Sequence, residues 1–336
     1  MIRYRWCVLT LAMLAAAVGA TRTHAASDCD RACLKTALDQ YLAAVIKHDP
    51  SAAPMAVGFR QTENAINTRP PTGVWKTVTG LGKVQRRYLD ASAGQAAFYG
   101  IVTEGSTEAI VTTRIRVEDR KITEAEWYIA RPGDPGLNGP AQAGRGPANL
   151  FNPEYLTANP PPERVVPKAQ RLSRESLVAV VNSYFDGITS HDGSVVLAHP
   201  GCNRVENGTL VTGRRGRGAG AAPPPSGPLA PAPAESDCVA GFANFSAQMV
   251  RARRFPVVDE EAGIVLAMAV FVRKPGSPTP RNVFSEWFVI DEGKIRNIWT
   301  AMFYPPADLA VPNWPPYDGN WPLPAGVVPG PAPARP

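Results

Sequence analysis

The chain has 336 residues, enough for one large domain or two domains of ordinary size. Its formal net charge at pH 7 is +6, and three of the positive charges (Arg3, Arg5 and Arg22) precede the first acidic residue. Without those three the net charge is +3, which is too small to indicate a nucleic-acid-binding protein. We therefore expect no nucleic-acid partner.

The first 25 residues have the features of a secretory signal peptide. Arg3 and Arg5 form a basic region, "CVLTLAMLAAAVGA" forms an apolar region, and Ala25 ends the small-residue motif "THA". The apolar region is shorter than the ~20 residues of a membrane-spanning helix. We predict cleavage, export to the periplasm or the extracellular space, and no membrane association afterwards.

Four cysteines follow the predicted signal peptide: Cys29, Cys33, Cys202 and Cys238. An even number in an exported protein indicates two disulfides. Of the three possible pairings we favour Cys202–Cys238 together with Cys29–Cys33. A metal site is the alternative, but Cys-x-x-x-Cys without a nearby histidine is a weak signal for one. We expect no metal and no cofactor.

Two parts of the chain repeat one pattern. "HDPSAAPMAVGFRQTEN" begins at His48, and "HDGSVVLAHPGCNRVEN" begins 143 residues later, at His191. Tyr41 and Tyr184 precede these segments at the same offset. Two further blocks recur in the same order: "RRYLDASAG" with "RRFPVVDEEAG", and "RVEDRKITEAEWYIA" with "VIDEGKIRNIWTAMF". Such self-similarity predicts two copies of one domain.

Each copy begins with an amphipathic helix, "LKTALDQYLAAVIKHD" or "SLVAVVNSYFDGITSHD", whose apolar residues recur at helical spacing. Ser173 and Ser176 are candidate N-caps of the second helix, and the His-Asp pairs are expected to end the helices. Long alternating segments follow, with "VEDRKI" and "IDEGKI" as hairpin turns. We predict an α+β fold of two tandem cone-shaped domains, each an N-terminal helix on a strongly curved, mostly antiparallel sheet.

Composition places the boundaries between these parts. We expect a signal peptide (1–25), a first domain (26–131), a Pro/Gly-rich linker over the surface (132–170), a second domain (171–304) with a flexible insert (213–236), and a Pro-rich tail (305–336).

The repeated segments, above all "RRFPVVDEEAGIV" and "FVIDEGKIRNIWTAMFYPP", resemble a domain family of unknown function in secreted fungal and bacterial proteins. That family is similar to the nuclear-transport-factor-2-like superfamily, which includes SnoaL-like cyclases and ketosteroid isomerase. The resemblance covers residues 29–131 and 171–304 and implies a pocket between helix and sheet. It also implies that the halves pair as an intramolecular pseudo-dimer. An acidic residue expected after "GKI" is Glu126 in the first half, but Trp299 stands there in the second, so the second pocket is expected to be altered.

The resemblance to ketosteroid isomerase implies a tyrosine on the first helix and a carboxylate about two dozen residues later. Tyr41 and Glu63, and likewise Tyr184 and Glu206, are 22 residues apart and are the candidate catalytic residues. A carboxylate desolvated in an apolar interior suits general-base chemistry, and a tyrosine hydroxyl suits a developing oxyanion. The alternative is structural: tyrosines in the core, and Glu-Asn segments that satisfy backbone groups.

The candidate ligand-binding residues are Asn64, Asn207, Glu126, Trp127 and Trp299. Glu126 and Trp127 must face opposite sides of one strand. We expect cofactor-independent proton transfer, elimination or hydration on a small apolar substrate. The alternative is a secreted module that binds a ligand or a protein without catalysis.

Overall fold

The computed structural model describes residues 28–136, 149–212, 237–245, 247–273 and 282–305. The predicted signal peptide, insert and nearly all of the tail lie outside these residues. None of the helices within the described ranges is long and apolar enough to cross a membrane.

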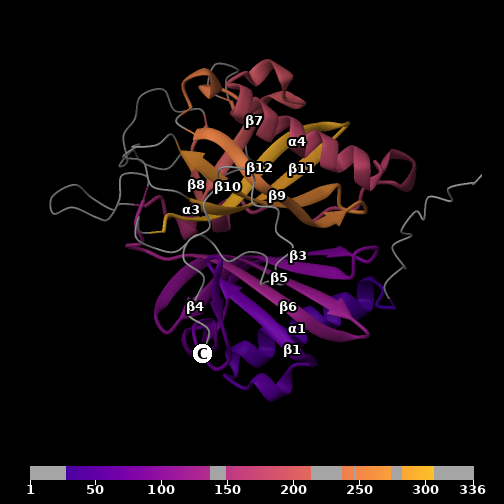
Figure 1. The fold of residues 1–336 in the computed structure, drawn as a ribbon, viewed down its shortest axis with the longest axis vertical. Helices are drawn as coiled ribbons and strands as arrows, with labels where there is room; N and C mark the ends of the chain where they lie inside the picture. Colours follow the sequence, from indigo (N-terminus) through magenta and orange to yellow (C-terminus); the bar gives the residue numbers. More distant parts are fainter. Residues whose placement is uncertain (1–27, 137–148, 213–236, 246, 274–281, 306–336) are drawn as a thin grey trace, which may run out of the picture.

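The first half is one helix followed by a six-stranded sheet (Figure 1). Its elements are α1 (Arg31–Ile46), η1 (Pro50–Ala52), β1 (Met55–Glu63), β2 (Ile66–Thr68), α2 (Val74–Thr77), β3 (Gly80–Asp90), β4 (Gln95–Glu104), β5 (Thr107–Glu118) and β6 (Lys121–Ala130). The strand order is β2-β1-β6-β5-β4-β3. Only the β1–β6 pair is parallel among these neighbours.

The second half repeats this plan. Its elements are α4 (Arg174–Ser190), η3 (Gly193–Val195), β7 (Ala198–Glu206), β8 (Thr209–Leu210), η5 (Phe242–Asn244), β9 (Ala247–Asp259), β10 (Ile264–Arg273), β11 (Val283–Asp291) and β12 (Lys294–Phe303). The strand order, β8-β7-β12-β11-β10-β9, matches the first sheet position by position, with β7 parallel to β12. The predicted α+β class and the tandem repeat are confirmed.

Local sequence explains where the elements begin and end. The Ser173 side chain caps α4 by accepting a hydrogen bond from the backbone of Ser176. His191 ends α4 with a left-handed φ of 57°, and Asp192 accepts a hydrogen bond from the next turn. Between β11 and β12, Glu292 and Gly293 both have positive φ, as a two-residue hairpin turn requires.

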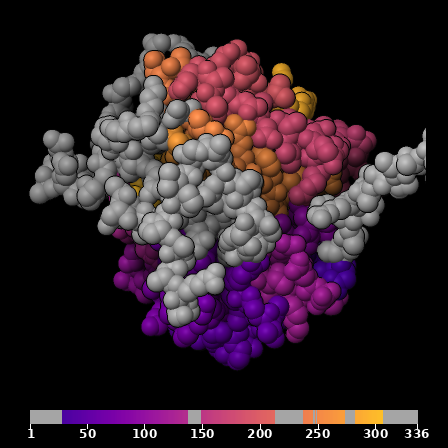
Figure 2. All heavy atoms as spheres, viewed as in Figure 1, coloured from indigo at the N-terminus to yellow at the C-terminus, as the bar shows by residue number. Residues whose placement is uncertain are grey.

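The two sheets pack face to face, and each helix covers the other face of its own sheet. One apolar cluster lies between α1 and the first sheet, a second lies between the two sheets, and a third lies between α4 and the second sheet. Where both halves are visible in the space-filling view, they abut directly (Figure 2). Because both faces of each sheet are covered, side chains on either side of a central strand are buried.

The linker differs from the expectation that it lies over the surface. Within the described residues 149–170 it contains α3 (Pro153–Ala158) and η2 (Lys168–Gln170). Asn152 caps α3, and Pro153 occupies its first turn, where a proline is tolerated. Tyr155 and Leu156 join the cluster between the sheets. The linker therefore contributes side chains to the core between the sheets.

Candidate functional site

Five polar side chains gather between α4 and the second sheet: Tyr184, Arg204, Glu206, Glu286 and Thr300. We call them the second-half polar cluster. Their strand neighbours Val205, Trp287 and Trp299 belong to the apolar cluster between the sheets, so alternation turns the polar residues toward α4. Phe284, Phe288, Ile298 and Met302 lie on that same side.

Arg204 is the centre of the cluster. Its Nη1 lies 2.9 Å from Oε1 of Glu206, and its Nη2 donates to Oε1 of Glu286 over 3.0 Å. Glu286, Thr300 and Tyr184 are fully buried, whereas the side chains of Arg204 and Glu206 are 11% and 15% exposed. The cluster thus begins at the solvent with Glu206 and reaches into the interior at Glu286.

Four buried atoms of this cluster have no hydrogen-bond partner among the described residues: Oη of Tyr184, Nε of Arg204, Oε2 of Glu286 and Oγ1 of Thr300. Most buried polar atoms in proteins are hydrogen-bonded, because an unmade bond leaves the cost of desolvation uncompensated. Four such atoms in one interior leave hydrogen-bonding capacity that the described side chains do not use.

The burial of Glu286 changes its acidity. Desolvation raises the pKa of the Glu286 carboxyl to about 7, since the favourable charge of Arg204 only partly offsets burial and the nearby Glu206 adds repulsion. Burial also raises the pKa of Tyr184. For Arg204 burial acts in the opposite direction, but the carboxylates of Glu206 and Glu286 outweigh it and raise the pKa. Arg204 stays charged at neutral pH while Glu286 populates both forms.

The same position in the first half is a closed hydrogen-bond network. Tyr41 donates to Oε1 of Gln61 over 2.8 Å and accepts from Nε1 of Trp127 over 2.9 Å. Nε1 of Trp75, on α2, donates to the same Gln61 oxygen over 2.8 Å. All four side chains are buried. The interior of the first half is therefore occupied by its own paired side chains.

The register of the two sheets aligns these networks. Trp127 pairs with Glu63 and Thr113, as Thr300 pairs with Glu206 and Glu286. Thr300 thus stands where the first half has Trp127, and Glu286 where it has Thr113. Gln61 and Arg204 share the 143-residue offset of the repeat.

Glu63 binds Arg131 and the start of α2 rather than reaching into the interior. Its Oε1 accepts from Arg131 over 2.9 Å, and its Oε2 accepts from the backbone N–H of Val74, at the start of α2, over 3.0 Å. Arg131 also binds Glu104. The carboxylate therefore has a partner for each oxygen.

Asn64 and Asn207 have backbone partners. The Asn64 amide exchanges two hydrogen bonds with the backbone of Ile129, at 3.1 Å and 2.9 Å. Asn207 does the same with Met302, at 3.0 Å and 2.8 Å. Both residues have positive φ and leave the strand, so the side chain completes the pairing that the backbone gives up.

Glu126 and Trp299 face the other sheet and not the helix-side interior. Glu126 bonds to Arg114 at 2.6 Å and to Arg254 of the second half at 2.7 Å. Trp299 donates to the backbone oxygen of Asn159 in the linker. These two residues therefore lie between the sheets and not between helix and sheet, where the resemblance placed the pocket. Trp127 faces α1, as part of the closed network.

Arg204, Glu286 and Thr300 were not predicted as site residues. One signal was available for Arg204, which precedes Glu206 by two residues and so shares its side of the strand. A second signal was the position of Glu286. It lies two residues from Phe284 and two from Phe288, so a single carboxylate shares one side of the strand with two aromatic rings.

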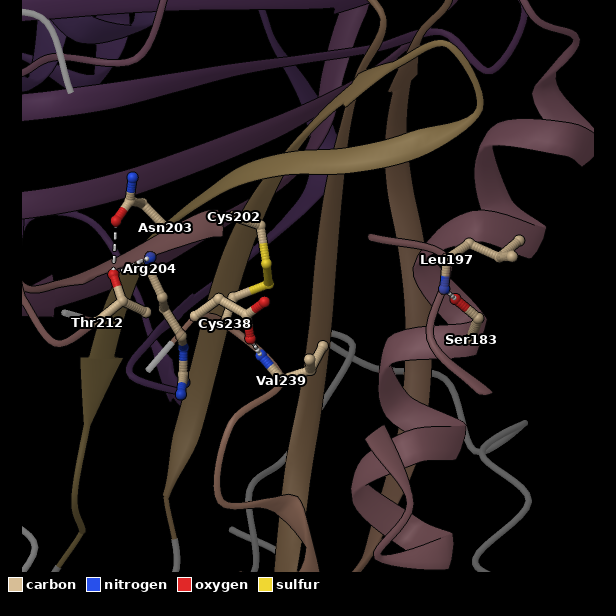
Figure 3. Close-up of a disulfide and its surroundings, with 9 residues drawn as sticks. Ser183, Leu197, Cys202, Asn203, Arg204, Thr212, Cys238 and Val239 are labelled. Carbon is tan, nitrogen blue, oxygen red and sulfur yellow. Dashed lines mark hydrogen bonds between the residues drawn. A yellow bond between two sulfur atoms is a disulfide. The ribbon is translucent and has the colours of Figure 1, made fainter. Parts of the chain in front are cut away.

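The predicted disulfides Cys29–Cys33 and Cys202–Cys238 are both present. Figure 3 shows that Cys202 lies on the same strand as Arg204 and ties it to the segment beginning at Cys238. That segment carries Phe242, whose ring centroid is 5.3 Å from that of Tyr184. The disulfide therefore anchors one wall of the polar cluster. Within the described ranges, no group of three or more His, Cys, Asp or Glu side chains is arranged to hold a metal ion.

Comparison with known proteins gives the second half a relative without an assigned activity. Residues 170–302 match the family described as "Domain of unknown function (DUF8021)". No curated protein matches the chain. A crystal structure of a protein of unknown function with a cystatin-like fold, from Methylobium petroleophilum PM1, is 17% identical over 41% of this chain and 82% of that chain, with a TM-score of 0.28.

Proposed function

We propose that the second half binds a small molecule between α4 and its sheet, and that Glu286 moves a proton to or from it without a cofactor. The observation that carries this proposal is a fully buried carboxylate with one oxygen on Arg204 and the other unpartnered among the described residues. A group of this kind is typical of an acid–base site.

The chemistry follows from the three side chains around the ligand position. With its pKa near 7, Glu286 can give or take a proton at neutral pH. The hydroxyl of Tyr184 and Nε–H of Arg204 are donors suited to oxygen that gains negative charge. Proton transfer beside a carbonyl, and elimination or hydration next to a carbonyl, all use a base together with a donor to the enolate oxygen. The resemblance to the nuclear-transport-factor-2-like superfamily supports the same group of reactions.

The first half does not repeat this site, because the corresponding side chains are already paired. Tyr41, Gln61 and Trp127 already satisfy one another, and Glu63 is held by Arg131. We therefore assign one site per chain. The disulfides fit an exported protein, periplasmic or extracellular, with the two halves paired within one chain.

A non-catalytic binding module is the second candidate. The ion pair between Arg204 and Glu286 favours it, because a carboxylate held at 3.0 Å by a guanidinium can serve as a fixed recognition group. The two functions differ in whether Glu286 exchanges its proton with the ligand.

Carbon-13 NMR of the glutamate carboxyls in the signal-free protein tests the proposal. We expect one resonance that titrates near pH 7 and disappears in Glu286→Gln. Proton–deuterium exchange of small enolisable ketones is then measured with the wild type, with Glu286→Gln and with the matched first-half variant Glu63→Gln. Exchange that is lost only in Glu286→Gln supports catalysis. Titration of Glu286 near the ordinary glutamate pKa of ~4.3 would remove the acid–base assignment.

A further inference from the structure

The first half fills the space beside its helix tyrosine, Tyr41, with a ring of its own. Inside the first half, the indole of Trp127 lies beside Tyr41, with ring centroids 6.3 Å apart, and its N–H binds the tyrosine hydroxyl. A flat ring with a polar edge therefore completes the interior of the first half. That ring belongs to the chain itself.

In the second half each partner of this tyrosine is replaced. Thr300 stands where the first half has Trp127, and Arg204 stands where it has Gln61. Phe242 stands in the place of Trp75, since His191 and His48 contact the backbone oxygens of these two residues in the same way. Threonine is too short to reproduce the indole, and arginine cannot accept a hydrogen bond. Tyr184 is left with its hydroxyl unpaired within the described residues.

The unpaired atoms define the polar edge that a ligand needs. Tyr184 and Arg204 each offer a donor, and Thr300 offers a hydroxyl on the same side of the sheet. An oxygen acceptor is the group that can pair with either donor. A group with only N–H donors leaves Nε of Arg204 unpaired, because a donor cannot bind a donor.

The surroundings of Tyr184 favour a planar ring. Phe242 and Phe288 meet Tyr184 edge to face, with centroids 5.3 Å and 5.4 Å away and interplanar angles of 73° and 69°. A flat ring placed beside Tyr184 would join this aromatic cluster through the offset or edge-to-face contacts that aromatic groups prefer.

We propose that the ligand is a small planar ring compound with a carbonyl or similar oxygen acceptor at one edge, bound beside Tyr184 as Trp127 is bound beside Tyr41. Its oxygen accepts from Tyr184 and Arg204. This inference rests on the proposed function for the location of the site, and it is independent of proton transfer by Glu286.

Isothermal titration of the full signal-free chain with three probes tests the ligand class. Acetophenone has both the ring and the carbonyl, cyclohexyl methyl ketone has the carbonyl without a planar ring, and toluene has the ring without an acceptor. We expect acetophenone to bind once per chain and about tenfold more tightly than either of the others, as the loss of one good interaction implies.

Variants locate the binding. Thr300→Trp restores the indole of the first half and should abolish acetophenone binding. Tyr184→Phe should weaken it about fivefold, as the loss of one hydrogen bond implies, whereas the matched Tyr41→Phe should leave it unchanged. Arg204→Gln, which copies Gln61, replaces Thr300→Trp if that variant does not fold, and it should also weaken binding.

Each other outcome is informative. Equal binding of cyclohexyl methyl ketone overturns the planar ring, and equal binding of toluene overturns the acceptor. Undiminished binding in Thr300→Trp, or no binding of any probe, overturns the inference. If Glu286 titrates near pH 7 while acetophenone fails to bind, the ligand class fails and the acid–base site stands. If acetophenone binds but Glu286 titrates near ~4.3, the ligand class stands and the proton transfer fails.

Discussion

Arg31, in the first turn of α1, donates two hydrogen bonds, of 2.8 Å and 3.1 Å, to the carboxylate of Asp259 at the end of β9, 228 residues away. The repeat supplies the reciprocal pair, in which Arg174 in the first turn of α4 binds Asp90 at the end of β3. Each aspartate also accepts a backbone N–H from the edge strand of the other half. The start of each helix is therefore fixed by the opposite half.

Replacing Asp259 with alanine should lower the free energy of unfolding by about 3 kcal/mol, because it removes the buried carboxylate that accepts from Arg31 and from the backbone N–H groups of Leu89 and Ala262. Urea unfolding monitored by tryptophan fluorescence measures this change. Glu118→Ala is the matched control, since its ion pair with Arg116 is exposed at both ends and should contribute less than about 1 kcal/mol. Equal losses in the two variants would contradict a locking role for the aspartate.

Glu286 should make the protein less stable as the pH rises. Its folded pKa of about 7 lies above the ordinary glutamate pKa of 4.5, so between these pH values the folded state retains a proton that the unfolded state has released. Stability is therefore greatest below about pH 4.5 for this group and falls by about 3 kcal/mol toward pH 7. Unfolding of the wild type and of Glu286→Gln at pH 5 and pH 8 measures the difference.

For that comparison, we expect the stability of Glu286→Gln relative to the wild type to increase from pH 5 to pH 8. Glu63→Gln, in the first half, should show no such increase. A relative stability that falls with pH would mean that the ionised carboxylate is favoured in the folded state.

The Cys202–Cys238 disulfide should contribute more stability than Cys29–Cys33. The first closes a loop with a sequence separation of 36 and the second one of only 4. The loop-entropy relation gives about 4 kcal/mol for the longer loop and about 2 kcal/mol for the shorter. Thermal unfolding of the two double cysteine-to-alanine variants gives the order directly. The reverse order would show that loop closure in the unfolded chain is not the dominant contribution.

Glu126 should be essential to the contact between the sheets. Replacing Glu126 with glutamine places the guanidinium groups of Arg114 and Arg254 beside a neutral amide inside the interface and should cost about 3 kcal/mol. Differential scanning calorimetry measures the change. Glu163→Gln is the control, because its side chain is 72% exposed in its ion pair with Arg86. A Glu126→Gln protein as stable as the control would show that the buried carboxylate is dispensable.

Local sequence was sufficient for much of the fold. The hairpin turn at Glu292 and Gly293, the cap at Ser173 and the end of α4 at His191 depend on neighbouring residues only, and each is present. The 143-residue repeat predicted two similar domains, and the two matching strand orders confirm this.

The candidate site was only partly accessible from the sequence. Alternation shows that Glu126 and Trp127 face opposite sides of β6, but it does not show which side α1 covers. The structure turns Trp127 to the helix and Glu126 to the second sheet. The position of Trp299, which follows the same register, could not be assigned to a face for the same reason.

The sequence by itself determined the repeat, the α+β class and the hairpins, because each depends on spacing along the chain, whereas it left three cysteine pairings possible. Tertiary structure alone decided that Glu286 lies with Arg204 toward α4 and that the linker enters the core. The physical reason is that both faces of the second sheet are covered. On β11, Phe284, Ser285, Glu286 and Trp287 are all fully buried, so no contrast between polar and apolar residues distinguishes the two faces before the halves dock.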